Sequence, residues 1–216
     1  MRIVFKDETF GEVKEISIII VINNRVLTRK MVRAGNCWLI DMDIPDGEHM
    51  YKYVINDSLR FNDKDAYKYV RWKDGEVWSV LKAEGGQVGQ QAVRKPVITG
   101  YSMTPGVRYG QYCSNHLFNN TLDEKYSISV DVSELTDIHS VTAIWYREDG
   151  SVYHIEEQTI DCPQDNYIYT VNAVFWIDIP AILYDTGNNW TVEIYIDGAL
   201  KIKDYFKNEN KGDKRN

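Results

Sequence analysis

The chain has 216 residues, 44% of them hydrophobic and 26% charged, which is enough for one large domain or two ordinary ones. Its 32 acidic residues outnumber its 25 basic residues, and the excess lies in the second half. Residues 1–95 carry 16 basic and 14 acidic side chains, whereas residues 96–216 carry 9 and 18. Neither half offers the broad positive field that phosphate backbones need, so nucleic acid is not expected as a partner.

The N-terminal sequence and the cysteines indicate a cytoplasmic protein. Met1–Phe5 leads directly into charged residues, so the apolar segment of a secretory signal is missing. The longest apolar run, residues 16–22, is too short to cross a bilayer, and no membrane partner is expected. Cys37, Cys113 and Cys162 lie far apart without metal-ligand spacing, so we expect reduced thiols, with a Cys113–Cys162 disulfide as the alternative.

Short strands are expected throughout the first 83 residues. The 15 Tyr and 6 Trp residues favour strands, and the apolar run Ile16–Ile22 is typical of a strand buried on both faces. Pro45-Asp46-Gly47 is a turn signal, and Asp74-Gly75 marks a tight hairpin turn. Further strands are expected at residues 38–44, 49–55, 67–72 and 77–81.

A second series of strands follows a change in composition. Residues 84–95 lose the alternation and carry three Gly and three Gln, which is typical of a linker. Beyond Pro96, strands are expected at residues 126–132, 141–146, 152–155, 167–179, 190–196 and 200–206. The predicted fold class is therefore all-β, with two immunoglobulin-like β-sandwich modules in tandem (1–83 and 96–207), a linker (84–95) and a flexible tail (208–216). One larger barrel is the alternative that the linker and the charge asymmetry disfavour.

Residues 38–81 resemble a known family of sugar-binding modules. The run W-L-I-D-M-D-I-P-D-G-E-H-M-Y-K-Y-V-I-N-D from Trp38 to Asp57 is followed by Asn62-Asp63 and by Gly75-Glu76-Val77-Trp78-Ser79-Val80. This order of strands and turns is similar to the glycogen-binding module, carbohydrate-binding family 48, over roughly residues 12–82. The resemblance implies an early-set immunoglobulin-like sandwich. The second module is only generically similar to immunoglobulin or fibronectin modules, through its last hairpin at residues 188–198.

The resemblance also implies where a glucan would bind. Family members that hold α-glucan use two stacking tryptophans, a lysine and an asparagine, because sugar C–H faces lie on aromatic faces while hydroxyls pair with polar groups. The lysine corresponds to Lys52, but Arg25 and Leu59 stand where the platform tryptophans belong. The candidate ligand-binding residues are therefore Lys52, Asn24 and the displaced aromatics Tyr67, Trp72 and Trp78.

No residue pattern indicates catalysis, a metal or a cofactor. Nucleotide-binding and nucleophile motifs are absent, and the four histidines are dispersed. The pairs Asp41/Asp43 and Asp63/Asp65 each share a strand face if extended, which solubility explains better than general acid–base chemistry. A Ca²⁺ site built from Asp63, Asp65 and Asp74 is a minor alternative.

Three functions remain open from the sequence. The leading hypothesis is a non-catalytic binding or scaffold protein whose first module binds α-glucan or another oligosaccharide. The alternative is protein–protein assembly, with a protein partner or a homo-oligomer, by a fold that has lost sugar binding. The third is a carbohydrate-active enzyme with a site built from loops.

Overall fold

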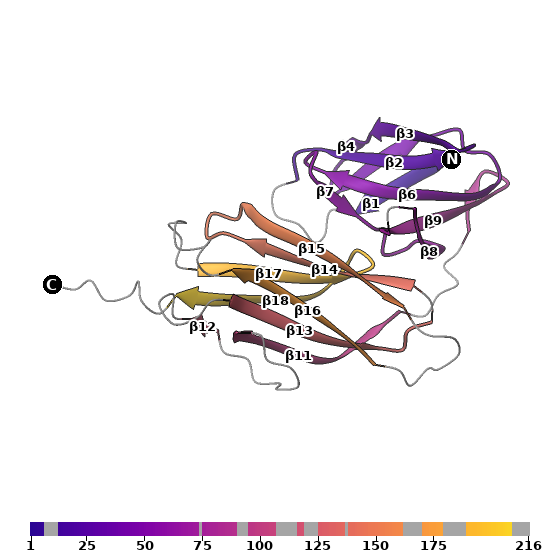
Figure 1. The fold of residues 1–216 in the computed structure, drawn as a ribbon. Helices are drawn as coiled ribbons and strands as arrows, with labels where there is room; N and C mark the ends of the chain where they lie inside the picture. The colour runs from indigo at the N-terminus through magenta and orange to yellow at the C-terminus, as the bar shows by residue number, and fades with distance from the viewer. Residues whose placement is uncertain are drawn as a thin grey trace. The chain divides into compact units, whose positions relative to one another are not determined.

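The all-β class predicted from the sequence is confirmed. The structure, a computed structural model, describes residues 1–6, 13–73, 75–89, 95–106, 116–118, 125–136, 138–161, 170–178 and 189–208, and every regular element in these ranges is a β-strand (Figure 1). The chain divides into two compact units. Unit 1 comprises residues 1–94 together with 137–140 and 196–199, and unit 2 comprises 95–136, 141–195 and 200–216.

Unit 1 contains two antiparallel sheets. The smaller has the strand order β1 (Arg2–Lys6), β5 (Cys37–Asp41), β4 (Val32–Ala34). The larger has the main order β10 (Gln87–Val88), β9 (Val77–Glu84), β6 (Gly47–Ile55), β2 (Ile16–Ile22), β3 (Arg25–Lys30). Two short strands complete it: β7 (Leu59–Phe61) pairs with β6, and β8 (Lys68–Arg71) pairs with β9.

The core of unit 1 lies between these sheets. The inner positions of β2 are Ile16, Ile18 and Ile20, each fully buried, as the continuous apolar run predicts. Phe5 of the smaller sheet packs edge-on against Tyr53 of the larger, with ring centroids 4.8 Å apart. The side chains that alternate with Tyr53 along β6, including Lys52, therefore belong to the outer face of the larger sheet.

The segment expected to be a linker begins as part of unit 1. β9 runs on to Glu84, and β10 pairs with it through Gln87 opposite Glu84 and Val88 opposite Ala83. Gly85 and Gly86, with φ of +59° and +77°, make the tight turn, because both backbone positions are in the left-handed region. The glycines read as linker composition thus close a hairpin, while residues 90–94 lie outside the described ranges.

Within its described residues, unit 2 also contains two sheets. One has the order β11 (Val97–Pro105), β13 (Lys125–Ser133), β16 (Val171–Asp178). The other has the order β12 (Leu117–Phe118), β18 (Ala199–Asn208), β17 (Asn189–Ile196), β14 (Ile138–Tyr146), β15 (Val152–Asp161). The ends of β14, β17 and β18 at residues 138–140, 196 and 199 group with unit 1. β18 reaches Asn208, so the first residue of the predicted tail is in a strand.

Aromatic rings fill the core of unit 2. Phe206 on β18 stacks on Tyr126 of β13 with ring centroids 4.2 Å apart. Trp145 and Trp190 flank the same Phe206 ring at 5.8 Å and 6.0 Å, and all four side chains are fully or almost fully buried. The abundance of Tyr and Trp in the sequence therefore reflects a core built on ring packing.

Candidate functional site

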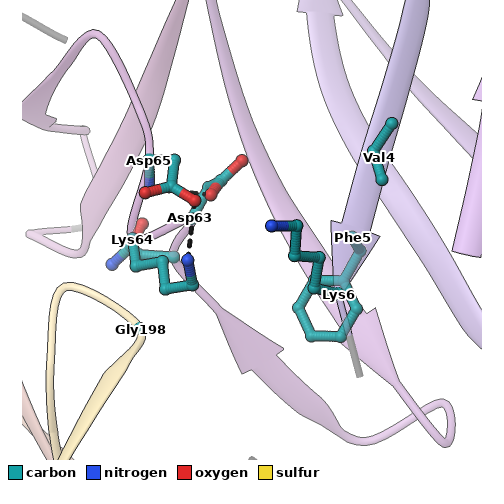
Figure 2. Close-up of a pocket in the computed structure, with 8 residues that line it drawn as sticks. Val4, Phe5, Lys6, Asp63, Lys64, Asp65 and Gly198 are labelled. Carbon is teal, nitrogen blue, oxygen red and sulfur yellow. Dashed lines mark hydrogen bonds and ion pairs between the residues drawn. The ribbon is translucent and has the colours of Figure 1, made fainter. Parts of the chain in front are cut away.

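A small pocket opens in unit 1 between β1 and the turn that follows β7. Its volume is about 210 Å³ (Figure 2). All of its lining residues belong to unit 1: Val4, Phe5, Lys6, Asn62, Asp63, Lys64, Asp65 and Gly198. The wall thus combines two apolar side chains with an amide, two carboxylates and two ammonium groups.

Asp63 anchors the polar side of this pocket. Its Oδ2 accepts hydrogen bonds from the hydroxyls of Tyr51 (2.7 Å) and Tyr53 (3.0 Å). Its Oδ1 accepts one from the backbone N–H of Asp65 (2.9 Å), the pattern of an Asx turn. Three hydrogen bonds therefore hold the Asp63 carboxylate in place. The bond from the Asp65 N–H also holds the turn that contains Lys64 and Asp65.

The backbone of Asp63 is held as firmly as its side chain. Its N–H donates to the Ser79 hydroxyl at 2.8 Å, and its carbonyl accepts from the Tyr69 hydroxyl at 2.8 Å. Ser79 and Tyr69 come from the paired strands β9 and β8. These hydrogen bonds tie the pocket wall to the paired strands β8 and β9, as a preformed binding site requires.

Two lysines and an aromatic ring complete the site. Figure 2 shows the Lys6 side chain extending from β1 with its ammonium directed toward the two aspartates. Lys64 Nζ lies 2.7 Å from Asp65 Oδ2, and the Asp65 side chain is 58% exposed. Phe5 is half-buried and forms the apolar wall from the same strand as Lys6.

Burial dominates the electrostatics around Asp63. It raises the pKa of the Asp63 carboxyl above its ordinary value, while the hydrogen bonds from Asp65, Tyr51 and Tyr53 oppose this rise. Burial, together with the Asp63 charge, raises the pKa of the Tyr51 and Tyr53 hydroxyls well above 10. Both tyrosines therefore stay protonated and act as donors over the physiological pH range.

The raised tyrosine pKa values predict alkaline unfolding. Their contribution to the free energy of unfolding is complete below pH 10, the ordinary pKa, and is lost as the pH rises through the folded-state values. Above pH 10, each buried tyrosine is expected to remove about 1.4 kcal/mol per pH unit. Urea unfolding followed at pH 8, 10 and 11 measures this loss. A free energy of unfolding that stays unchanged between pH 10 and pH 11 would contradict it.

The described carboxylates of the pocket already have partners within the protein. Among the described residues, no group of three or more His, Cys, Asp or Glu side chains is placed to hold an ion. Of the three aspartates considered for Ca²⁺, Asp63 already accepts three hydrogen bonds, Asp65 pairs with Lys64, and Asp74 lies outside the described residues. The pocket instead offers hydrogen-bond acceptors and donors beside an aromatic wall.

Three of the five predicted ligand-binding residues lie near one another, away from this pocket. Lys52 and Trp78 occupy the outer face of the larger sheet, because they alternate in phase with the paired residues Met50 and Val80. Trp72 lies 5.9 Å from Trp78 between ring centroids. Yet the Lys52 side chain is only 2% exposed, with its ammonium 3.3 Å from Glu76 Oε2, and Trp78 is buried.

The other predicted positions are more dispersed. Tyr67 is half-buried beneath the Lys82 ammonium, which lies 5.6 Å from its ring centroid. Asn24 is exposed in the β2–β3 turn, where its φ of +61° is one that Asn tolerates. Leu59, at one lost platform position, is buried in β7, and Arg25, at the other, is exposed on β3. Cys113 and Cys162 lie outside the described residues, and Cys37 is a free thiol.

The sequence reasoning missed Phe5 and Lys6 as lining residues. They are adjacent in sequence and far from Asp63, and β1 reaches the site because its sheet packs on the larger sheet, with Phe5 against Tyr53. Asn62-Asp63 is part of the family resemblance, but the role of Asp63 in the pocket depends on the hydroxyls of Tyr51 and Tyr53. The sequence signal for this contact is a pair of tyrosines on one face of a strand, followed by an Asp that can accept hydrogen bonds from their hydroxyls. In the other aspartate pair, Asp41 binds Arg2 on the surface.

Comparisons with known proteins leave the family open. No protein-family model and no curated protein matches the chain, so the resemblance to the glycogen-binding module stays a prediction. Among solved structures, an immunoglobulin-like protein from Pseudomonas aeruginosa is similar over 55% of this chain and 99% of its own, with a TM-score of 0.38 and 12% identity. A Bacteroides uniformis β-glucuronidase is similar over 94% of this chain but 23% of its own, with a TM-score of 0.32 and 12% identity.

A further solved structure is a tetra-tandem repeat from the extending region of a large adhesion protein. It is similar over 95% of this chain and 44% of its own, with a TM-score of 0.25 and 12% identity. TM-scores this low assign neither a family nor a function. Within the described residues, no helix has the length and hydrophobicity needed to span a membrane.

Proposed function

We propose that the chain is a non-catalytic binding protein and that unit 1 binds a sugar residue of an oligosaccharide or α-glucan in the Asp63 pocket. The observation that carries this proposal is the composition of the pocket wall. Carboxylate oxygens of Asp63 and Asp65, ammonium groups of Lys6 and Lys64, and the Phe5 ring line one cavity. Sugar recognition uses this combination, because hydroxyls both donate and accept hydrogen bonds while the C–H face packs on an aromatic ring.

The dimensions of the pocket support a small polar ligand. Its volume of about 210 Å³ lies below the roughly 300–1,000 Å³ of sites that hold drug-sized molecules. One sugar ring, free or at the end of a chain, matches that scale. The Asx turn and the Ser79 contact hold the wall in place before ligand arrives, which limits the entropy lost on binding.

The outer face with Lys52 is the less favourable place for a sugar. Trp78, the aromatic residue next to Lys52 on this face, is buried and offers no ring face for stacking. The Lys52 ammonium sits beneath Glu76 rather than on the surface. The Lys52 side chain is almost fully covered, whereas the Asp65 side chain, although paired with Lys64, is more than half exposed to solvent.

A binding role also fits the state of the pocket carboxylates. Both Asp63 oxygens are occupied by donors from the protein, so this carboxylate acts as a fixed acceptor rather than as a mobile acid or base. Asp65 has the Lys64 ammonium 2.7 Å away. Glycoside cleavage needs instead a carboxylic acid that is free to donate its proton to the leaving group.

Affinity electrophoresis through a gel containing glycogen or amylopectin tests the proposal. The wild-type protein is expected to be retarded, and Asp65→Ala is expected to weaken apparent binding at least tenfold, since an exposed acceptor is removed with little effect on folding. Trp72→Ala serves as the matched control on the outer face and should migrate like the wild type. If Trp72→Ala abolishes the retardation and Asp65→Ala does not, the sugar binds on the outer face and the proposed site is wrong.

A further inference from the structure

Two consecutive edge strands form an exposed rim of unit 1. β3 ends the path of the larger sheet and β4 ends the path of the smaller one, with Met31 as the single residue between them. In the ranges that the structure describes, no strand pairs with the far edge of either. We call Arg25–Lys30 together with Val32–Ala34 the β3–β4 rim.

The rim is basic. Arg25, Arg29, Lys30 and Arg33 lie in residues 25–40, which contain no Asp or Glu. Lys30 pairs with Glu15 at 2.7 Å, and Arg29 donates to a neighbouring backbone carbonyl. No described carboxylate partners Arg25 or Arg29. The rim is therefore a local positive surface in a chain whose total charge is −7.

The rim also exposes aliphatic side chains. Val26 is 62% exposed and Val32 is 71% exposed, more than the other large hydrophobic residues found exposed in the described part of unit 1. Charged residues alone would be the usual protection of a strand edge against aggregation. Exposed valines beside the arginines, on an edge that no described strand covers, are instead suited to receive another strand.

We propose that the β3–β4 rim binds an extended acidic segment of a partner protein by strand addition. The segment would hydrogen-bond along the free backbone edge of β3 and place carboxylates beside Arg25 and Arg29. Charge complementarity selects this occupant: a second β3 strand would bring arginines against arginines, and like charges on adjacent strands repel.

The side-chain alternation of β3 defines the partner further. Arg25, Leu27 and Arg29 point to one face of the sheet, and Val26, Thr28 and Lys30 point to the other. Leu27 is the half-buried member of β3. A strand laid beside β3 would therefore best carry one apolar residue opposite Leu27. Acidic residues two positions before and two positions after it would lie beside the arginines, in the pattern acidic–x–apolar–x–acidic.

Titration of the ¹⁵N-labelled full chain with a short peptide that carries the acidic–x–apolar–x–acidic pattern, such as Glu-Thr-Val-Thr-Glu, tests the inference. Amide shifts are expected on residues 25–34, and affinity should fall with rising salt because the contacts are exposed ion pairs. The double variant Arg25→Glu/Arg29→Glu should weaken binding at least tenfold. Arg71→Glu/Lys201→Glu, two exposed residues given the same charge change, should alter it less than twofold.

Backbone methylation of the peptide separates strand addition from simple charge attraction. N-methyl groups on the peptide edge that faces β3 should abolish binding, whereas the same number on the opposite edge should not. Equal effects from both edges would overturn strand addition. Three other outcomes would overturn the proposed occupant. The first is amide shifts outside the rim, and the second is arginine-dependent binding of duplex DNA instead of the peptide. The third is self-association of the free chain through residues 25–34. Sugar binding in the Asp63 pocket is unaffected by any of these outcomes.

Discussion

Replacing Asp63 with alanine is expected to lower the free energy of unfolding by about 3 kcal/mol or more. The substitution leaves the buried hydroxyls of Tyr51 and Tyr53 without their acceptor, and each buried unsatisfied group costs about 1–3 kcal/mol. The Asx turn to Asp65 is lost as well. Urea unfolding, followed by tryptophan fluorescence, measures the change.

The charge of Asp63 gives this prediction a pH signature. Its folded-state pKa is raised by burial, so ionisation of Asp63 disfavours the folded state. As the pH falls from neutral through this raised pKa toward the ordinary value, this group should increase the free energy of unfolding. Asp63→Asn, which keeps a carbonyl acceptor for the tyrosines, should lack that increase.

Asp65→Asn is the matched control for Asp63. The Asp65 side chain is largely exposed, and exposed ion pairs contribute about 0–1 kcal/mol. Its unfolding midpoint should therefore lie close to that of the wild type. Equal loss of stability in Asp63→Ala and Asp65→Asn would mean that the tyrosine–aspartate network does not support unit 1.

The second large effect is expected in unit 2, where Phe206→Ala should lower the free energy of unfolding by about 3–5 kcal/mol. Phe206 is fully buried and touches Tyr126, Trp145 and Trp190, so truncation opens a cavity in the centre of the aromatic core. Tyr205→Ala is the neighbouring control, because Tyr205 is 59% exposed on the opposite face of β18. Its effect should stay within about 0.5 kcal/mol. A similar loss in both variants would contradict the assignment of Phe206 to the core.

The strands of this chain could be predicted because their signals are local. Ile16–Ile22 forms a strand with its inner side chains fully buried, and the alternation at residues 49–55 corresponds to β6. Gly85 and Gly86 were less decisive, since the same residues fit a linker and the hairpin that the structure contains. Glycine-rich composition indicates a flexible backbone, which suits both a linker and a tight turn. Which of the two forms depends on whether another strand pairs with the segment.

The candidate site could be predicted only in part, because it depends on contacts between distant strands. Lys52 was singled out by its place in a sequence pattern, but its burial results from neighbours on β2 and β9 that alternation alone does not reveal. Phe5 and Lys6 reach the pocket through the packing of one sheet on the other. The spacing of residues in the sequence does not predict such contacts between two sheets.

The proposal of a sugar pocket without turnover is tested most directly by one titration. The ¹⁵N-labelled full chain is mixed with maltooligosaccharides while amide shifts are recorded and the sugar is recovered for analysis. The proposal predicts saturable shifts at Lys6 and at residues 62–65, with every sugar returned intact. Absence of shifts at these residues, or shortened products that depend on Asp65, would contradict it.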